Sequence, residues 1–171
     1  MLIIDEIPVT ELNFADEDRL IAQRLTQAEQ PAEMIARDRN HPSVVLWCVG
    51  NEPMVGNPLG SGSPPPSKGV EAGSRFFKPL YRQVRLLDVT RPVMLVGVQG
   101  GPPVWLGICE VIGANRYYRW YTQPGQLQLA AQELERELDT LHQAFGKPII
   151  LTEFGTDATA GVHPTPPKMW T

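Results

Sequence analysis

Two glutamates in this sequence stand directly after strongly apolar segments. Glu52 closely follows residues 44–49, and Glu153 follows residues 148–152. The end of a buried strand is a costly place for a charge unless the charge has a partner or a task. Two facing carboxyl groups can hydrolyse a glycosidic bond: one donates a proton to the leaving oxygen, and the other attacks the anomeric carbon or activates water. Each glutamate alone fits a salt-bridged rim residue equally well, so the pair carries the prediction.

An aromatic cluster lies in the segment before the second glutamate. It comprises Tyr117, Tyr118, Trp120 and Tyr121, directly after Asn115 and Arg116. Aromatic faces stack on the C–H groups of a pyranose, and a tyrosine hydroxyl can orient a carboxylate. Packing at the rim of the fold explains the cluster equally well when it is considered by itself.

The elements that would position these groups follow from apolar runs and helical periodicity. Buried strands are expected at residues 2–4, 44–49, 93–98, 108–114 and 148–152, and helices at 31–39, 73–88 and 126–145, with a further polar helical stretch before Pro31. The last helix has an expected core stripe of Leu127, Leu134, Leu138, Leu141 and Phe145, and Glu133, Glu135 and Glu137 are expected on its solvated face. Residues 56–69, rich in proline and glycine, are expected to form a long surface loop.

Apolar strands that alternate with helices predict an α/β fold with a parallel sheet covered by helices. A (β/α)8 TIM barrel uses about 31 residues per unit, so 171 residues hold five to six units. The five expected strands therefore predict a partial barrel occupying residues 1–171. The alternative is a doubly wound open sheet, but Gly97, Gly100 and Gly101 lack the spacing of its phosphate loop. In a barrel, the groups at the carboxyl ends of the strands form the site, and Asp5 and Glu6 could support it there.

The charge, the apolar runs and the numbers of cysteine and histidine argue against several classes of function. A net charge of −4 does not favour nucleic acid as a partner, and no apolar run approaches the roughly 20 residues of a membrane helix. Two cysteines and the scattered His41, His142 and His163 give no disulfide framework or metal-ligand pattern, so neither metal nor cofactor is expected. The absence of a secretory signal predicts a cytoplasmic protein.

Several long segments resemble glycoside hydrolase family 2, in the same order along the chain. Residues 40–47 (NHPSVVLW) with 50–53 (GNEP) are similar to its acid/base signature. Residues 115–121 (NRYYRWY) and 150–157 (ILTEFGTD) resemble the β-glucuronidase branch in particular, and residues 160–163 (AGVH) are also similar. The similarity runs from Leu2 to Trp170 and implies the third to seventh strands of the barrel.

The resemblance also implies roles. Glu52 would be the general acid/base and Glu153 the nucleophile of a retaining mechanism on β-D-glucuronides, with the carboxyl groups about 5–5.5 Å apart. Asn51 would contact the sugar 2-hydroxyl, Tyr117 would bind the nucleophile, and Tyr121 would border the sugar pocket. Asn115 and His163 complete the expected substrate-binding set.

The sequence departs from the family in what it lacks. Family members carry two β-sandwich domains before the barrel, and the asparagine–lysine pair that grips the substrate carboxylate lies beyond this segment. Two alternatives therefore stay open: a catalytically incomplete barrel piece, or another family 2 β-glycosidase such as a β-galactosidase. An open five-stranded sheet would also leave two bare edges, which favours self-association that completes the barrel.

Overall fold

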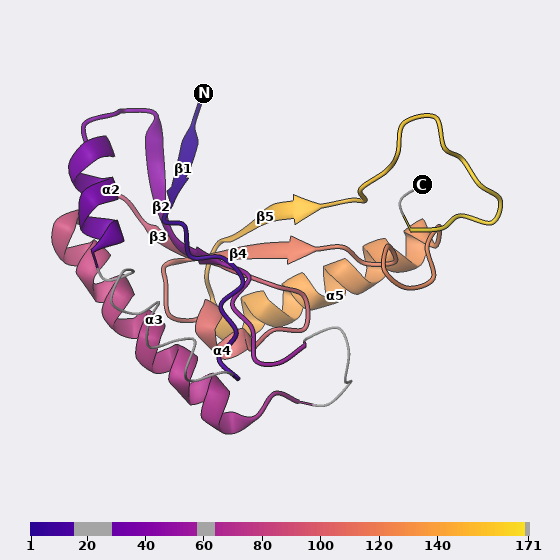
Figure 1. Cartoon of the computed structure of the whole chain (residues 1–171), viewed down its shortest axis with the longest axis horizontal. Helices are drawn as coiled ribbons and strands as arrows, with labels where there is room; N and C mark the ends of the chain where they lie inside the picture. The colour runs from indigo at the N-terminus through magenta and orange to yellow at the C-terminus, as the bar shows by residue number, and fades with distance from the viewer. Residues whose placement is uncertain (16–28, 58–63, 170–171) are drawn as a thin grey trace.

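The computed structural model contains one parallel sheet, described over residues 1–15, 29–57 and 64–169 (Figure 1). Its five strands are β1 (Ile3–Glu6), β2 (Val44–Asn51), β3 (Val93–Gly97), β4 (Val111–Arg116) and β5 (Ile149–Phe154). They lie side by side in chain order, and each neighbouring pair is parallel. This is the sheet of a half-barrel, and it confirms the predicted partial TIM barrel.

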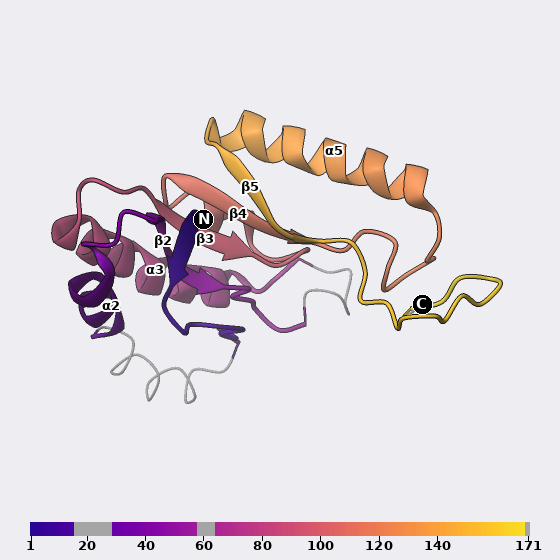
Figure 2. The same cartoon turned by 90° about the horizontal axis from the view of Figure 1, so that it is seen from above.

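Within the described residues, four helices connect the strands and cover the sheet. They are α2 (Gln30–Asp38), α3 (Ser67–Leu87), α4 (Pro103–Leu106) and α5 (Leu127–Phe145). Helices α2 and α3 lie beside β1 to β3, whereas α5 lies over β4 and β5 (Figures 1 and 2). Pro31 stands in the first turn of α2, where its missing N–H has no helical partner to lose, and Gly146 ends α5 in the left-handed conformation.

The main core lies between β2, β3 and helices α3 and α4. Trp47, Phe77 and Trp105 are almost completely buried there, with Phe14 packed edge-on against Phe77 and Trp105. Gly73 lets α3 approach closely, since a Cβ at this position would lie 2.2 Å from the Trp105 ring. This packing fixes the central strands, whose carboxyl ends carry Asn51 and precede Gln99.

The outer strands are less buried than the sequence predicts. Leu2 is 75% exposed and Ile3 and Ile4 are also exposed, while β5 is only half-buried. The prediction of fully buried strands at residues 2–4 and 148–152 is therefore wrong, because these strands lie at the two edges of the sheet that the described residues form.

Several element boundaries also differ from the predictions. Helix α3 begins six residues earlier, so residues 67–69 of the expected loop are helical, and the short helix α4 was not predicted. Strands β4 and β5 continue past their predicted ends, so that Asn115 and Glu153 lie within strands. The polar helical stretch expected before Pro31 falls mainly on residues 16–28, outside the described residues.

The predicted core stripe of α5 is only partly correct. Leu141 is buried, and Leu134, Leu138 and Phe145 are partly buried, but Leu127 is 77% exposed. Leu127 opens the helix, which begins beyond the end of the sheet and so has no strand beneath its first turn (Figure 2).

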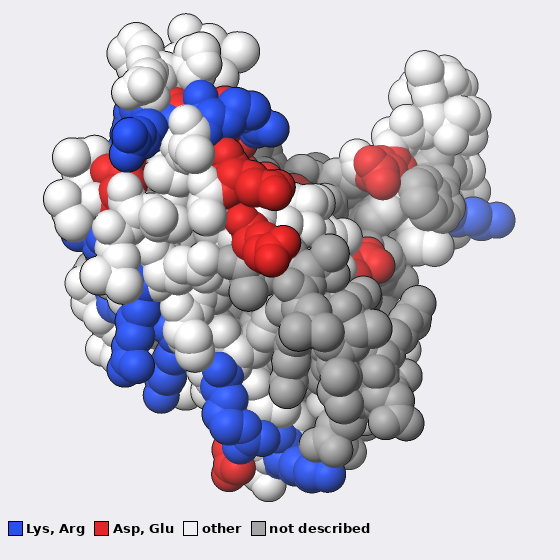
Figure 3. Space-filling model, turned by 60° about the vertical axis from the view of Figure 1, so that its left-hand side comes forward, with Lys and Arg blue, Asp and Glu red and all other residues white. Residues whose placement is uncertain are grey.

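Charge is unevenly distributed despite the small net value. Lys and Arg side chains form a row over α3, while Asp and Glu side chains gather elsewhere on the same face (Figure 3). In the described part of the chain, no helix is long and apolar enough to cross a membrane.

Candidate active site

Asn51, the last residue of β2, and Glu52, which follows it, are the first two site residues. The pairing of β2 with β3 shifts register between Cys48 and Asn51, which re-aims the strand at this point. The backbone N–H of Glu52 donates to the Val96 carbonyl at 3.0 Å, and Glu52 itself adopts a left-handed φ of 52°. Such strained backbone is typical of functional positions.

Asn115 on β4 forms hydrogen bonds to residues at the ends of both β2 and β5. Its side-chain amide is fully buried and donates to Asn51 Oδ1 at 3.0 Å and to Glu52 Oε1 at 3.1 Å. Its own Oδ1 accepts a hydrogen bond of 2.6 Å from the Thr152 hydroxyl on β5. One side chain on β4 therefore connects the ends of β2 and β5.

Glu153 is held by an aromatic neighbour. The Tyr117 hydroxyl donates to Glu153 Oε2 at 2.5 Å. This hydrogen bond, together with burial, raises the pKa of Tyr117 well above its usual range, because only the neutral phenol can donate it and a phenolate beside the carboxylate would be repelled. Tyr117, Trp120 and Tyr121 pack against one another with ring centroids 4.4 to 6.1 Å apart.

The environment shifts the protonation of Glu52 in the direction that an acid requires. Burial raises the pKa of Glu52, the hydrogen bond from Asn115 opposes this rise, and the charges of Glu153 and Glu11 add to it. A carboxyl group with a raised pKa keeps its proton to higher pH and can donate it.

Glu6 is the last residue of β1. Its Oε2 accepts a hydrogen bond of 2.9 Å from the buried Cys48 thiol. Burial raises the pKa of Glu6, and the charge of Glu153 contributes to the rise. Asp5, the other carboxylate at this strand end, instead interacts with Asp38 and Arg37.

A cavity of about 210 Å³ opens at this edge of the sheet. It is lined by Glu52, Asn115, Tyr117 and Tyr121, and further by Glu11, Met54, Asn57, Val98 and Gln99. A larger cavity of about 320 Å³ lies between the first half of α5 and the segment after β5. Glu52 lines the smaller cavity but not the larger one, and Glu153 lines neither. The smaller cavity is therefore the candidate site.

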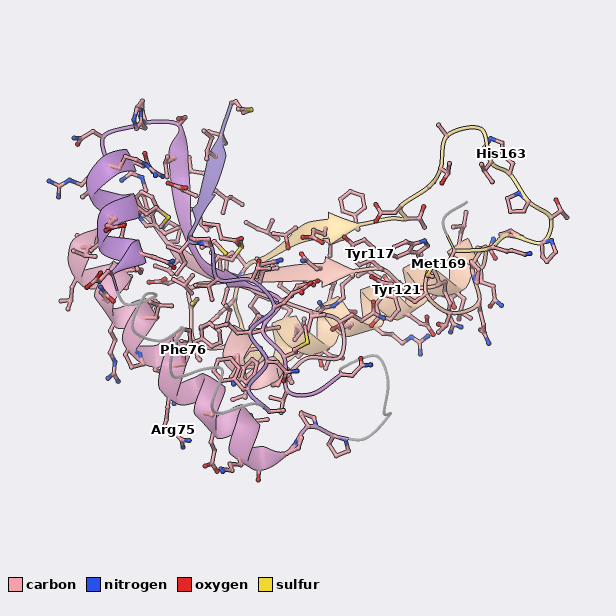
Figure 4. All side chains as sticks on the ribbon, in the orientation of Figure 1. Arg75, Phe76, Tyr117, Tyr121, His163 and Met169 are labelled. Carbon is pink, nitrogen blue, oxygen red and sulfur yellow. The ribbon has the colours of Figure 1, made fainter. Side chains whose placement is uncertain are left out.

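The structure brings most of the predicted site residues together. Asn51, Glu52 and Asn115 form one hydrogen-bonded group, and Tyr117 links Glu153 to the same strand end. His163 is exposed on the segment after β5, which projects beyond the sheet away from Tyr117 and Tyr121 (Figure 4).

The segment after β4 is anchored from behind by α5. The Arg116 side chain is only 2% exposed and binds Glu137 at 2.7 Å and the Gly97 carbonyl at 2.6 Å. The Tyr118 hydroxyl also donates to Glu137, and Arg119 pairs with Glu133. The prediction that Glu133 and Glu137 are solvated is therefore wrong.

Sequence reasoning missed two kinds of residue. Glu11 lines the cavity, but its position after an irregular segment gave no periodic signal. Arg116 and Glu137 form an ion pair although they are 21 residues apart in the sequence. The one available signal was that an arginine beside a buried strand requires an acidic or polar partner.

Consecutive parallel strands, helices between them and polar groups at the strand carboxyl ends define a partial TIM-barrel domain with a two-carboxylate site. The family "glycosyl hydrolases family 2, TIM barrel domain" matches residues 4–171. The chain therefore belongs to glycosyl hydrolase family 2.

Several proteins similar to this chain are β-glucuronidases. The Paenibacillus borealis β-glucuronidase is 34% identical over the whole chain, and the mouse enzyme is 32% identical over 99% of it. Among solved structures, a β-D-glucuronidase of Dictyoglomus thermophilum covers the whole chain with 34% identity and a TM-score of 0.78. A Bifidobacterium dentium β-glucuronidase, complexed with coumarin-3-O-glucuronide, also covers the whole chain with 34% identity and a TM-score of 0.76.

The chain corresponds to only part of these relatives. It spans 28% of the Paenibacillus protein, 24% of the mouse protein, 29% of the Dictyoglomus chain and 26% of the Bifidobacterium chain.

Proposed function

We propose that residues 1–171 form part of the catalytic barrel of a β-glucuronidase that hydrolyses β-D-glucuronides with retention of configuration. The observation that carries the proposal is that Glu52, Asn115 and Tyr117 line one cavity, while Tyr117 also holds Glu153 through a hydrogen bond. Its relatives named β-glucuronidase supply the sugar class, and the complex with coumarin-3-O-glucuronide in one of them agrees with it.

In the proposed first step, Glu153 attacks the anomeric carbon and forms a glycosyl ester while the bond to the leaving oxygen breaks. Glu52 gives its proton to that oxygen, and its raised pKa suits this role. In the second step Glu52 takes a proton from water, the water oxygen bonds to the anomeric carbon, and Glu153 leaves as a carboxylate.

The neighbours of the carboxyl groups have matching tasks. Asn51 is proposed to bind the sugar 2-hydroxyl, because the Asn115 amide holds it beside Glu52, which lines the cavity. Tyr117 keeps Glu153 oriented through a 2.5 Å hydrogen bond, and Tyr121 is proposed to border the sugar. His163 is proposed to join the site only if the projecting segment folds back towards it.

Self-association and a cellular location are also part of the proposal. The exposed edge strands β1 and β5 favour association that completes the barrel. A cytoplasmic location is also proposed.

Turnover of a fluorogenic aryl β-glucuronide by the purified chain tests the proposal, with the matching aryl β-galactoside in parallel. We expect release of the fluorophore from the glucuronide, slower release from the galactoside, and loss of both activities in Glu153→Gln. Faster turnover of the galactoside would contradict the sugar class. Activity that persists in Glu153→Gln would contradict the nucleophile, and absence of turnover would show a catalytically incomplete piece.

A further inference from the structure

Glu11 is a carboxylate at the cavity that the proposed hydrolysis does not use. It lies in the segment between β1 and α2 and lines the cavity together with Glu52 and Asn115. The side chain is exposed, so its charge can meet a ligand without the cost of burying an unpaired carboxylate.

The backbone holds Glu11 firmly beside the end of β2. Its N–H donates to the Asn51 carbonyl at 2.9 Å, and the preceding Thr10 pairs with Asn51 in a parallel bridge. Glu11 also adopts a left-handed φ of 51°, which is uncommon for a residue with a side chain and costs free energy unless the surroundings impose it. Its position relative to Glu52 is therefore fixed by the fold.

The topology puts Glu11 on the leaving-group side of the site. β1 pairs with β2, which carries Asn51 and precedes Glu52, whereas Glu153 lies on β5 at the other edge of the sheet. A general acid protonates the oxygen of the leaving group, so a charge beside the acid and opposite the nucleophile faces that group.

The charges around Glu52 come from three elements. Glu11 precedes α2, Glu153 lies on β5, and both raise the pKa of Glu52, while Arg116 on β4 lowers it. Arg116 is committed to Glu137 and to two backbone carbonyls, so it is directed away from the cavity. Glu11 and Glu52 line the cavity and Arg116 does not, so a ligand in the cavity meets carboxylates.

We propose that Glu11 determines the charge preference for the leaving group, favouring β-glucuronides whose aglycone carries a positive charge near the glycosidic oxygen. This inference rests on the proposed function. An exposed charge pair contributes modestly, so the expected preference is about three- to fivefold and falls with added salt.

Binding of two non-hydrolysable aryl β-thioglucuronides tests this inference without requiring turnover. One analogue carries a 3-aminomethyl group and the other a 3-hydroxymethyl group on the same ring, and calorimetry gives both affinities. The variants are Glu11→Gln, which removes the charge, and Glu11→Gly, which also relieves the left-handed backbone. Glu33→Gln on α2 is the matched control, since Glu33 is exposed and does not line the cavity.

We expect the protein and the Glu33→Gln control to bind the cationic analogue about three- to fivefold more tightly, and both Glu11 variants to lose this preference. The Glu52 carboxyl, followed by carbon-13 NMR, should also titrate at lower pH in Glu11→Gln, because a like charge is removed. A preference that survives in Glu11→Gln, or equal binding by the unaltered protein, would overturn the inference while leaving the proposed function intact. Failure to bind either analogue would overturn the proposed function and the inference with it.

Discussion

The two ends of the sheet carry polar networks of opposite character. At the amino end, Asp88 accepts hydrogen bonds from Trp47 Nε1, Arg91 and both the backbone and hydroxyl of Thr90. At the carboxyl end, Glu52 lines a cavity and Glu153 lies near the end of β5. Asn115 donates to one oxygen of Glu52, and Tyr117 donates to one oxygen of Glu153.

Protonation follows the same division. Burial works against the charge on Asp88, but the hydrogen bonds outweigh it and hold the pKa of Asp88 far below its usual range. Burial raises the pKa of Glu52, and the hydrogen bond from Asn115 does not offset this rise. The amino end is thus organised to keep a charge satisfied, and the carboxyl end to let a proton move, as expected for stability and chemistry on a barrel.

The largest effect is expected at the acid. Glu52→Gln should lower the rate on an aryl β-glucuronide with a poor leaving group by about 10²- to 10⁴-fold, because general acid catalysis is lost. A leaving group that departs readily as an anion needs less help, so its rate should fall much less. Measuring kcat/KM for both substrates checks this, and equal losses would contradict the acid role.

Asp88→Asn should cost stability instead. The change weakens charge-assisted bonds from Arg91 and Thr90, so the free energy of unfolding should fall by about 2–3 kcal/mol. Urea unfolding measures the loss, and the exposed Asp139→Asn is the control. A loss in Asp88→Asn no larger than in the control would show that the amino-end network is not stabilising.

The same network should respond to acid. Because the pKa of Asp88 is lowered on folding, its stabilisation is present above the unfolded value of about 3.9 and is lost as the pH falls through the lower folded value. The difference in unfolding free energy between the protein and Asp88→Asn should therefore shrink as the pH falls from 5 towards 2. A difference that grows with acid would have the wrong sign.

A smaller loss of stability is expected at Glu137, which holds the segment after β4 from helix α5. Glu137→Gln removes the charge that binds Arg116 and Tyr118, so stability should fall by about 1–2 kcal/mol. If this anchor also positions the segment after β4, the carbon-13 resonance of the Tyr117 ring should move as well. Glu135→Gln on the exposed face of α5 is the control, and movement confined to Tyr118 would limit Glu137 to a local role.

The smallest effect belongs to an exposed pair on α3. Glu71 and Arg75 lie 3.6 Å apart one helical turn from each other, and both are well exposed. Glu71→Gln should change the unfolding free energy by less than about 0.5 kcal/mol. A larger loss, measured by urea unfolding, would show that burial does not separate the strong networks from the weak ones.

Much of this arrangement could be predicted from local pattern. Apolar runs place β2, β3 and β5, and the residues after them include Glu52 and Gln99. Helical spacing puts Phe76, Phe77, Leu80, Val84 and Leu87 on one face of the helix predicted at residues 73–88. Of these, Phe77, Leu80 and Val84 are buried in α3, whereas Phe76 is half-buried and Leu87 is exposed. These elements can be predicted from the sequence because their local conformational preferences and their patterns of buried apolar residues favour the same structure.

Long-range contacts account for what could not be predicted. Glu137 has the sequence context of a solvated helix face, and only the position of Arg116 makes it an anchor. Glu11 has no periodic context, and its place depends on a backbone bond to Asn51. β1 and β5 are exposed because they are the edge strands of the described sheet, and no property of the strands themselves reveals that position.

Covalent trapping tests most directly whether the carboxyl-end network performs the chemistry. The protein is incubated with a 2-deoxy-2-fluoro-β-glucuronyl fluoride, which forms the glycosyl ester readily but hydrolyses slowly, and the labelled peptide is identified by mass spectrometry. We predict a single label on Glu153. A label on Glu6, Glu52 or any other residue, or no label under conditions that keep the protein folded, would contradict the account.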